Sequence, residues 1–84
     1  MESDARYIKK LEGVLSDYTE EELEVRKYKV NIKDEQLARL VCYHPSTNQM
    51  INYRIYTTPE GVVTKIEIEK KIKGKNVWVE LKPL

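Results

Sequence analysis

The sequence predicts an α+β fold in which an N-terminal amphipathic helix packs on a four- to five-stranded antiparallel meander sheet. Apolar residues near the N-terminus recur at three- and four-residue spacing, which is the period of an α-helix. Later in the chain, apolar and polar residues alternate, which is the period of a strand with one buried face. Short turn sequences separate the last alternating runs, as expected of hairpin connections. The helix carries the long apolar stripe that such a sheet needs to cover one face.

The predicted helix spans about residues 4–17. Ser3 is a suitable N-cap because its hydroxyl can accept a hydrogen bond from the first turn, and Asp4 places a negative charge at the positive end of the helix dipole. The apolar face comprises Tyr7, Ile8, Leu11, Val14, Leu15 and Tyr18. The face toward water carries Arg6, Lys9, Lys10 and Glu12.

An acidic segment follows the helix. Thr19 and Glu22 have the spacing of a capping box, which would start a second short helical turn. We favour the alternative, a solvated acidic connection. In the run from Leu23 to Lys33 the apolar positions change phase at Arg26–Lys27, which predicts a strand with either a bulge or a late start.

Residues 34–40 allow two interpretations. Asp34 could cap a short helix in which Leu37, Leu40 and Val41 share one face. Alternatively, the segment from Leu37 to His44 forms a strand. We favour the strand because it runs directly into the turn-forming sequence Pro-Ser-Thr-Asn.

The next two strands are joined by a predicted turn at Thr58-Pro59-Glu60-Gly61, in which proline fixes φ and glycine accepts the left-handed conformation. In the strand before this turn, Ile51, Tyr53 and Ile55 alternate with Asn52, Arg54 and Tyr56. In the strand after it, we expect core-facing Val62, Thr64, Ile66 and Ile68, and solvent-facing Lys65, Glu67 and Glu69.

A second turn is predicted at Lys73-Gly74-Lys75-Asn76 and leads into the last strand. In that strand Val77, Val79 and Leu81 alternate with Trp78, Glu80 and Lys82. Pro83 ends the sheet because it has no amide hydrogen to donate.

Length and charge limit the class of protein. The 84 residues predict a single domain, with the helix at about 4–17 and the sheet at about 23–82. The 15 Lys and Arg residues against 14 Asp and Glu give a net charge of +1, which excludes a protein that coats DNA through bulk charge.

The single Cys42 excludes an intrachain disulfide and predicts a reducing, cytoplasmic setting. The N-terminal residues lack the apolar run of a signal peptide, and no stretch has the length of a membrane-spanning helix, so no membrane partner is expected. Lys, Glu, Ile and Val are abundant and Phe is absent, which is the bias of thermophile proteins.

The sequence does not contain a sufficient set of residues for catalysis or metal binding. Cys42 and His44 share a strand face and could begin a nucleophilic or metal site, but the chain has one Cys and one His. Glu67 and Glu69 are interpreted as solvated charges. Three glycines and no phosphate-loop motif argue against a nucleotide site. We predict a non-enzymatic protein without cofactor, metal or small-molecule substrate, with a Cys42/His44 site completed in an oligomer as the exception.

The candidate functional residues form a basic hairpin and an Arg/aromatic face. The hairpin lysines are Lys70, Lys71, Lys73 and Lys75. By alternation, the solvent face displays Arg54, Tyr56, Lys65 and Trp78. Arg39 and Tyr43 would join them if the segment from Leu37 to His44 is a strand. Lysines suit phosphate contact, and Arg with aromatic side chains suits base packing. The predicted function is therefore binding of DNA or RNA.

Two other interpretations use the same residues. Lysines at a hairpin tip also keep an edge strand from pairing with other chains, and Glu67, Glu69 and Glu80 on the solvent face would repel phosphate. The same face, with Met50 and Val63, has the composition of a protein interface. The alternative prediction is a non-enzymatic, homodimeric interaction or regulatory protein.

Overall fold

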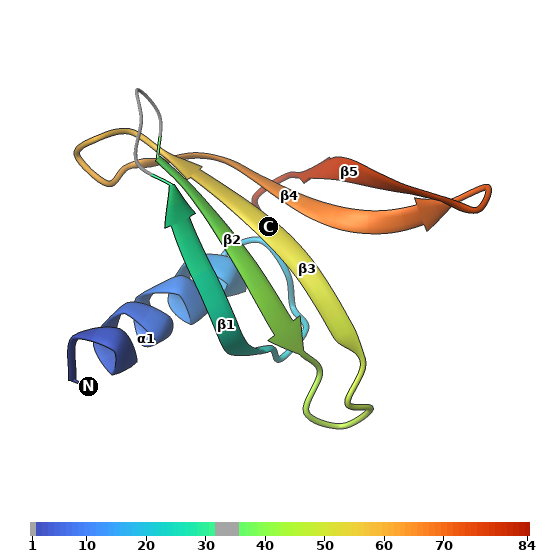
Figure 1. The fold of residues 1–84 in the computed structure, drawn as a ribbon, viewed down its shortest axis with the longest axis horizontal. Coiled ribbons are helices and arrows are strands. Elements are labelled where there is room, and N and C mark those ends of the chain that lie inside the picture. The colour runs from blue at the N-terminus through green and yellow to red at the C-terminus, as the bar shows by residue number, and fades with distance from the viewer. Residues whose placement is uncertain (1, 32–35) are drawn as a thin grey trace.

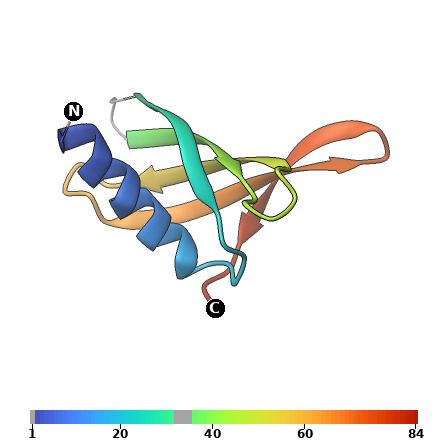
Figure 2. The ribbon, with the colours of Figure 1, turned by 90° about the horizontal axis from the view of Figure 1, so that it is seen from below.

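The predicted α+β architecture is confirmed: one N-terminal helix precedes a five-stranded, open antiparallel sheet in which consecutive strands are neighbours (Figure 1). A computed structural model of the chain describes residues 2–31 and 36–84. The elements are α1 (Glu2–Ser16), β1 (Glu24–Asn31), β2 (Gln36–Tyr43), β3 (Met50–Thr57), β4 (Val63–Ile72) and β5 (Lys75–Leu81). Figure 2 shows α1 lying diagonally across one face of the sheet. We call this the inner face, and the opposite one the outer face.

The core lies between α1 and the inner face. Its buried residues are Leu11, Leu15, Val25, Ala38, Leu40, Cys42, Tyr53, Ile55 and Ile66. Leu11 and Leu15 come from the predicted apolar face of the helix, and burying each such side chain contributes about 1.5–3 kcal/mol. Ser3 is not the N-cap, because the helix already includes Glu2.

The segment between α1 and β1 is an acidic connection, as favoured above, and not a second helical turn. Thr19 accepts a hydrogen bond at its Oγ1 from the amide of Glu21, at 3.2 Å. This local bond satisfies a backbone donor without a capping box. The connection returns the chain from the end of α1 to the first strand.

Of the two alternatives for β1, a bulge or a late start, the structure has the bulge. Val25 pairs with Cys42 and Lys27 pairs with Val41, so Arg26 is the extra residue. The bulge shifts the alternation by one residue, which keeps both apolar halves of β1 on the inner face.

The segment from Gln36 to Tyr43 is a strand, as favoured, and its register with β3 is continuous. The proposed cap at Asp34 lies outside the described residues.

The turn between β3 and β4 has the predicted form. The amide of Gly61 donates to the carbonyl of Thr58 at 2.9 Å, and Gly61 has φ of 88°, which favours glycine. The predicted inward phase of Val62 and Thr64 is wrong. The register shifts so that Thr57 pairs with Val63, which packs against the core, while Val62 is 62% exposed.

Thr64 occupies the irregular position of this second bulge. Its hydroxyl donates to the carbonyl of Tyr56 at 3.2 Å, which satisfies an acceptor near the point where the regular ladder is interrupted. The bulge restores the expected phase from Lys65 onward. Ile66 and Ile68 therefore face the core side, as predicted.

Strands β4 and β5 continue beyond β3 as a two-stranded ribbon. The register with β3 ends at Tyr53–Ile68, whereas β4 and β5 stay paired to Ile72–Lys75. We call this ribbon, Glu69–Trp78, the arm. Figures 1 and 2 show it projecting from the body of the sheet. Its turn is shorter than predicted, because Lys75 already belongs to β5.

Candidate nucleic-acid interface

Cross-strand pairing determines which side chains share the outer face. Arg39 of β2 is opposite Arg54 of β3, which is opposite Glu67 of β4, which is opposite Glu80 of β5. Tyr56 is opposite Lys65. Trp78 precedes Glu80 by two residues on β5 and therefore lies on the same face. The predicted residues Arg54, Tyr56, Lys65 and Trp78 therefore belong to one face.

The carboxylate of Glu67 connects three of these side chains. Tyr56 donates its hydroxyl hydrogen to Glu67 Oε1 at 2.8 Å. Arg54 Nη1 lies 3.7 Å from the same oxygen, and Lys65 Nζ lies 4.0 Å from Oε2. One carboxylate therefore partly neutralises two cations, and Arg54 and Lys65 keep a net charge of +1 around it.

Stacking connects the same cations to the aromatic rings. The guanidinium carbon of Arg54 lies 3.8 Å from the centre of the Trp78 ring, and Lys65 Nζ lies 4.4 Å from the centre of the Tyr56 ring. Such cation–π contacts stabilise a partly solvated pair by about 0.5–1 kcal/mol. The Nε atom of Arg54 is buried and has no hydrogen-bond partner among the described residues. Each aromatic ring is thus covered on one side by a cation.

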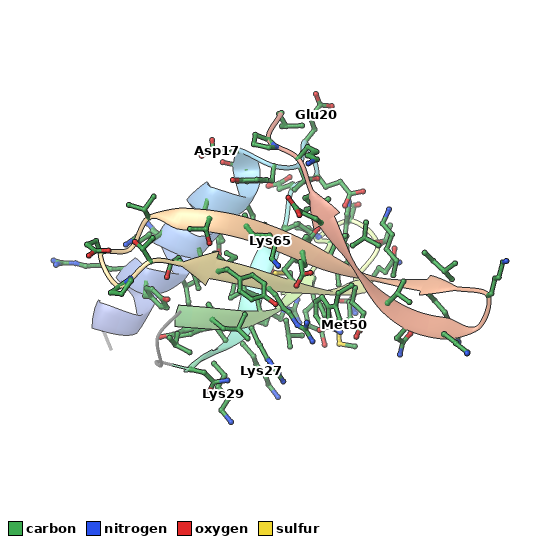
Figure 3. The ribbon with its side chains drawn as sticks, turned by 90° about the horizontal axis from the view of Figure 1, so that it is seen from above. Asp17, Glu20, Lys27, Lys29, Met50 and Lys65 are labelled. Atoms are coloured by element: carbon green, nitrogen blue, oxygen red, sulfur yellow. The ribbon has the colours of Figure 1, made fainter. Side chains whose placement is uncertain are left out.

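A second group of cations lies on β1 and β2. Arg26, Lys27, Lys29 and Arg39 are all exposed. The Arg26 guanidinium lies 4.3 Å from the centre of the Tyr43 ring and 3.7 Å from a carboxylate oxygen of Glu24. Figure 3 shows Lys27 and Lys29 at the opposite side of the view from Asp17 and Glu20.

Sequence reasoning missed Arg26, Lys27 and Lys29 as site residues. Their signal was present, because a bulge at Arg26–Lys27 followed by alternation places Lys27 and Lys29 together on the side away from the apolar residues. We call Glu67 with Arg54, Tyr56, Lys65 and Trp78 the Glu67 cluster. The cations of β1 and β2 together with this cluster form what we call the basic face. This surface extends beyond the residues predicted from sequence, because it also includes the cations of β1.

The four predicted hairpin lysines lie on the arm and are all exposed. Register places Lys70 and Lys75 on the inner side of the ribbon with Ile72, and Lys71 on the outer side. None of the four forms an ion pair within the described part of the chain. The arm lysines are separate from the Glu67 cluster. Lys71, for example, lies four residues beyond Glu67 on β4, which corresponds to about 13 Å of strand.

The described carboxylates near the base of the arm are Glu69, Glu80 and Glu21, and Glu21 lines a surface hollow together with Lys70 and Lys71. Glu69 at the base of the arm accepts a hydrogen bond from Asn52 Nδ2 at 3.0 Å. Glu80 is exposed and lies 3.9 Å from Lys82 Nζ. Lys82 partly offsets the charge of Glu80, whereas the neutral amide of Asn52 leaves the charge of Glu69 in place.

The structure does not support a reactive Cys42/His44 pair within one chain. Cys42 is fully buried, and burial together with the negative charge of Glu12 raises the pKa of its thiol to about 12. A thiol with this pKa stays protonated at neutral pH and is a poor nucleophile. His44 instead shares a hydrogen bond at Nδ1 with the Ser46 hydroxyl, at 2.8 Å.

The cavity between α1 and the sheet is small. It has a volume of about 80 Å³, and its lining is mainly apolar, with Lys10 and Gly61 among the lining residues. Ligand sites for metabolites of ordinary size are commonly about 300–1,000 Å³. Two further hollows, of about 450 and about 480 Å³, are more open to solvent, and this cavity itself is too small for such a ligand.

Residues 2–31 and 36–84 include no group of three or more His, Cys, Asp or Glu that could hold a metal ion. In the same ranges, no helix has the length and apolar character needed to cross a membrane. No protein-family model matches the chain, and no curated protein or solved structure is significantly similar to it.

Proposed function

We propose that this protein binds nucleic acid through the basic face and the arm. The observation that carries the proposal is the uneven distribution of charge over a chain whose net charge is +1. The sheet cations gather on the outer face and the arm, whereas the connection after α1 is acidic. A molecule with little net charge can then present a local positive surface to phosphate.

The charged residues assigned by register make this asymmetry explicit. Register places Lys27, Lys29, Arg39, Arg54, Lys65, Lys70, Lys71 and Lys75 on the outer face and arm, and these cations are joined by Arg26 of the bulge, over the Tyr43 ring, and Lys73 of the arm turn. The carboxylates of the same surface are Glu24, Glu67, Glu69 and Glu80. The excess of cations supports contact with several phosphates at once.

The aromatic side chains support the same proposal. Tyr43, Tyr56 and Trp78 are half-buried, and each has a cation over its ring. Sheets that present aromatic and Arg side chains provide stacking surfaces for bases alongside phosphate contacts. The basic face combines both kinds of contact.

The test is a salt titration of binding. Fluorescence anisotropy of labelled oligonucleotides is measured with the wild-type protein at about 50 and about 200 mM salt, a range in which counterion release strongly weakens binding. The variant Lys27→Gln/Lys29→Gln removes two charges from the basic face. Its slope of log K against log salt should be smaller by about 1.8 if both lysines contact phosphate of a duplex.

The matched control removes two lysines from the exposed side of α1, as Lys9→Gln/Lys10→Gln. This variant has the same net charge as the outer-face variant, so an effect of total charge would appear in both. We expect the control to bind with the wild-type slope. Absence of binding by the wild-type protein at about 50 mM salt, or equal effects of the two variants, would contradict the proposal.

The alternative, a homodimer through the outer face, is favoured by Met50. This side chain is 55% exposed and is opposite Tyr43 on the outer face. Val63, the other residue expected in this interface, packs against the core and therefore does not contribute to the outer face. Sedimentation equilibrium of the wild-type protein and of Trp78→Ala separates the alternatives, because apolar association would weaken in the variant and change little with salt.

A further inference from the structure

We infer that the arm enters the major groove of duplex DNA and places Ile72 against the edges of the bases. This inference rests on the proposed nucleic-acid function and names its ligand. The arm has the length, width, charge and exposed apolar tip residue that such contact requires.

The arm is long enough to reach the floor of a groove. From the last residue paired with β3, Ile68, to the tip residue Ile72, the ribbon extends by four residues, or about 13 Å. The major groove of B-DNA is about 8.5 Å deep and about 12 Å wide, and it admits a two-stranded β-ribbon. The body of the sheet can therefore remain outside the groove while the tip reaches the bases.

The tip is narrow because its turn has two residues. Lys73 and Gly74 have φ of 52° and 79°, the left-handed pair of a type I′ turn. Ile72 and Lys75 pair directly across this turn. No loop widens the end of the ribbon.

Lysines are distributed for contact with both walls of the groove. Lys70 and Lys75 lie on one side of the ribbon, Lys71 lies on the other, and Lys73 is in the turn. The walls of the groove are the two phosphate backbones. A ribbon with cations on both sides is complementary to that arrangement, and a flat basic surface would contact a backbone on one side alone.

Ile72 is the apolar residue of this tip. It is 48% exposed and lies on the same side as Lys70 and Lys75. The floor of the major groove offers an apolar partner in the methyl group of thymine. Contact with a base edge would remove the exposed surface of Ile72 from water, which contact with phosphate alone would not do.

Competition among nucleic acids tests the inference. The protein is bound to labelled duplex DNA at about 50 mM salt, where counterion release favours binding. Unlabelled duplex DNA, duplex RNA and single-stranded DNA, all of the same sequence, are then compared as competitors. The A-form major groove is deep and too narrow for side chains to read. We expect duplex DNA to be the strongest competitor and bound duplex DNA to show protection of guanine N7, which faces the major groove, from dimethyl sulfate.

Two further variants separate the tip from the rest of the surface. Ile72→Ala should weaken duplex DNA binding by about tenfold with little change in salt slope, because it removes apolar contact and no charge. Val62→Ala alters a comparably exposed apolar residue in the β3–β4 turn and should bind as the wild type does. Lys73→Gln/Lys75→Gln should reduce both the salt slope and the protection of N7.

The outcomes distinguish the two levels of the argument. If the wild-type protein binds no oligonucleotide at about 50 mM salt, the proposed function fails. If it binds, but duplex RNA or single-stranded DNA competes equally, guanine N7 stays reactive, or Ile72→Ala binds as tightly as Val62→Ala, the groove inference is overturned and the proposed function stands.

Discussion

At the scale of single residues, Cys42 illustrates how burial changes side-chain chemistry. The pKa of its thiol is raised from an ordinary 9.0 to about 12, first by burial and then by the charge of Glu12. The folded protein therefore retains a proton that the unfolded chain loses above pH 9. The stability linked to this proton is fully present below pH 9 and is lost as the pH rises toward 12.

The expected result is a fall in the free energy of unfolding of about 1 kcal/mol between pH 9 and 10, because the unfolded thiol passes from half to almost fully ionised over this interval. Urea unfolding followed by Trp78 fluorescence at pH 8, 9 and 10 measures it. Cys42→Ala should be less stable at pH 8, because it leaves a cavity, but its stability should change less between pH 9 and 10. Equal slopes for the two proteins would contradict the prediction.

Tyrosines add to the same effect at higher pH. Burial raises the pKa of Tyr53 above its ordinary 10.0, and the nearby Cys42 and Glu21 raise it further. Burial also raises the pKa of Tyr7. Both therefore steepen the loss of stability as the pH approaches and passes 10, and this contribution is common to the wild type and Cys42→Ala, so the difference between the two proteins isolates the thiol.

At the scale of elements, the pairing of β3 with β4 determines how much positive charge the basic face can offer. Glu67 is held by Tyr56, Arg54 and Lys65. Replacing it as Glu67→Gln preserves an oxygen that can accept from the Tyr56 hydroxyl, and it removes the charge that neutralises the cations. Arg54 and Lys65 would then interact with phosphate without competition.

Under the proposed function, Glu67→Gln should bind nucleic acid up to about tenfold more tightly at about 50 mM salt, with a salt slope larger by about 0.9 for one added phosphate contact on a duplex. Anisotropy titrations measure both quantities. Glu60→Gln, in the exposed β3–β4 turn, is the control for loss of one negative charge. No difference between the two variants would place the Glu67 cluster outside the contact surface.

Much of this element structure was predictable because its signals are local. The helical period, the alternation of the strands and the phase change at Arg26–Lys27 are all contained within short windows of sequence. The inward phase of Val62 and Thr64 was not predictable in this way, because it depends on the register between two strands. At Val62 and Val63 two adjacent apolar residues make the alternation ambiguous, and pairing with β3 decides which of them faces the core.

The same distinction applies to the candidate site. Alternation was enough to place Arg54, Tyr56, Lys65 and Trp78 on one face. The central position of Glu67 required the cross-strand register, and the projection of the arm required the point at which pairing with β3 stops. Both are relations between separate segments, which the order of residues in one strand does not contain.

At the scale of the whole molecule, shape and charge are both asymmetric. The Cα radius of gyration is 12.8 Å, against about 12 Å expected for a compact chain of 84 residues, and the extents are 36 × 27 × 23 Å. The projecting arm agrees with this extension. Its exposed lysines are at one extremity of the molecule (Figure 1), so under the proposed function they extend the reach of the positive charge beyond the body.

The position of the arm beyond the two layers of the body, α1 and the sheet, also has a consequence for amide hydrogen exchange. Amides at Lys70–Val77 are held by one hairpin, and an isolated two-stranded hairpin is marginally stable in water. These amides should exchange through local opening, whereas those of β2 and β3 around Leu40 and Tyr53 should require global unfolding. Exchange followed by NMR should show the arm exchanging fastest among the strands, and slowing when duplex DNA is bound. Arm amides that exchange as slowly as those of Leu40 would mean that the ribbon opens only when the whole fold does.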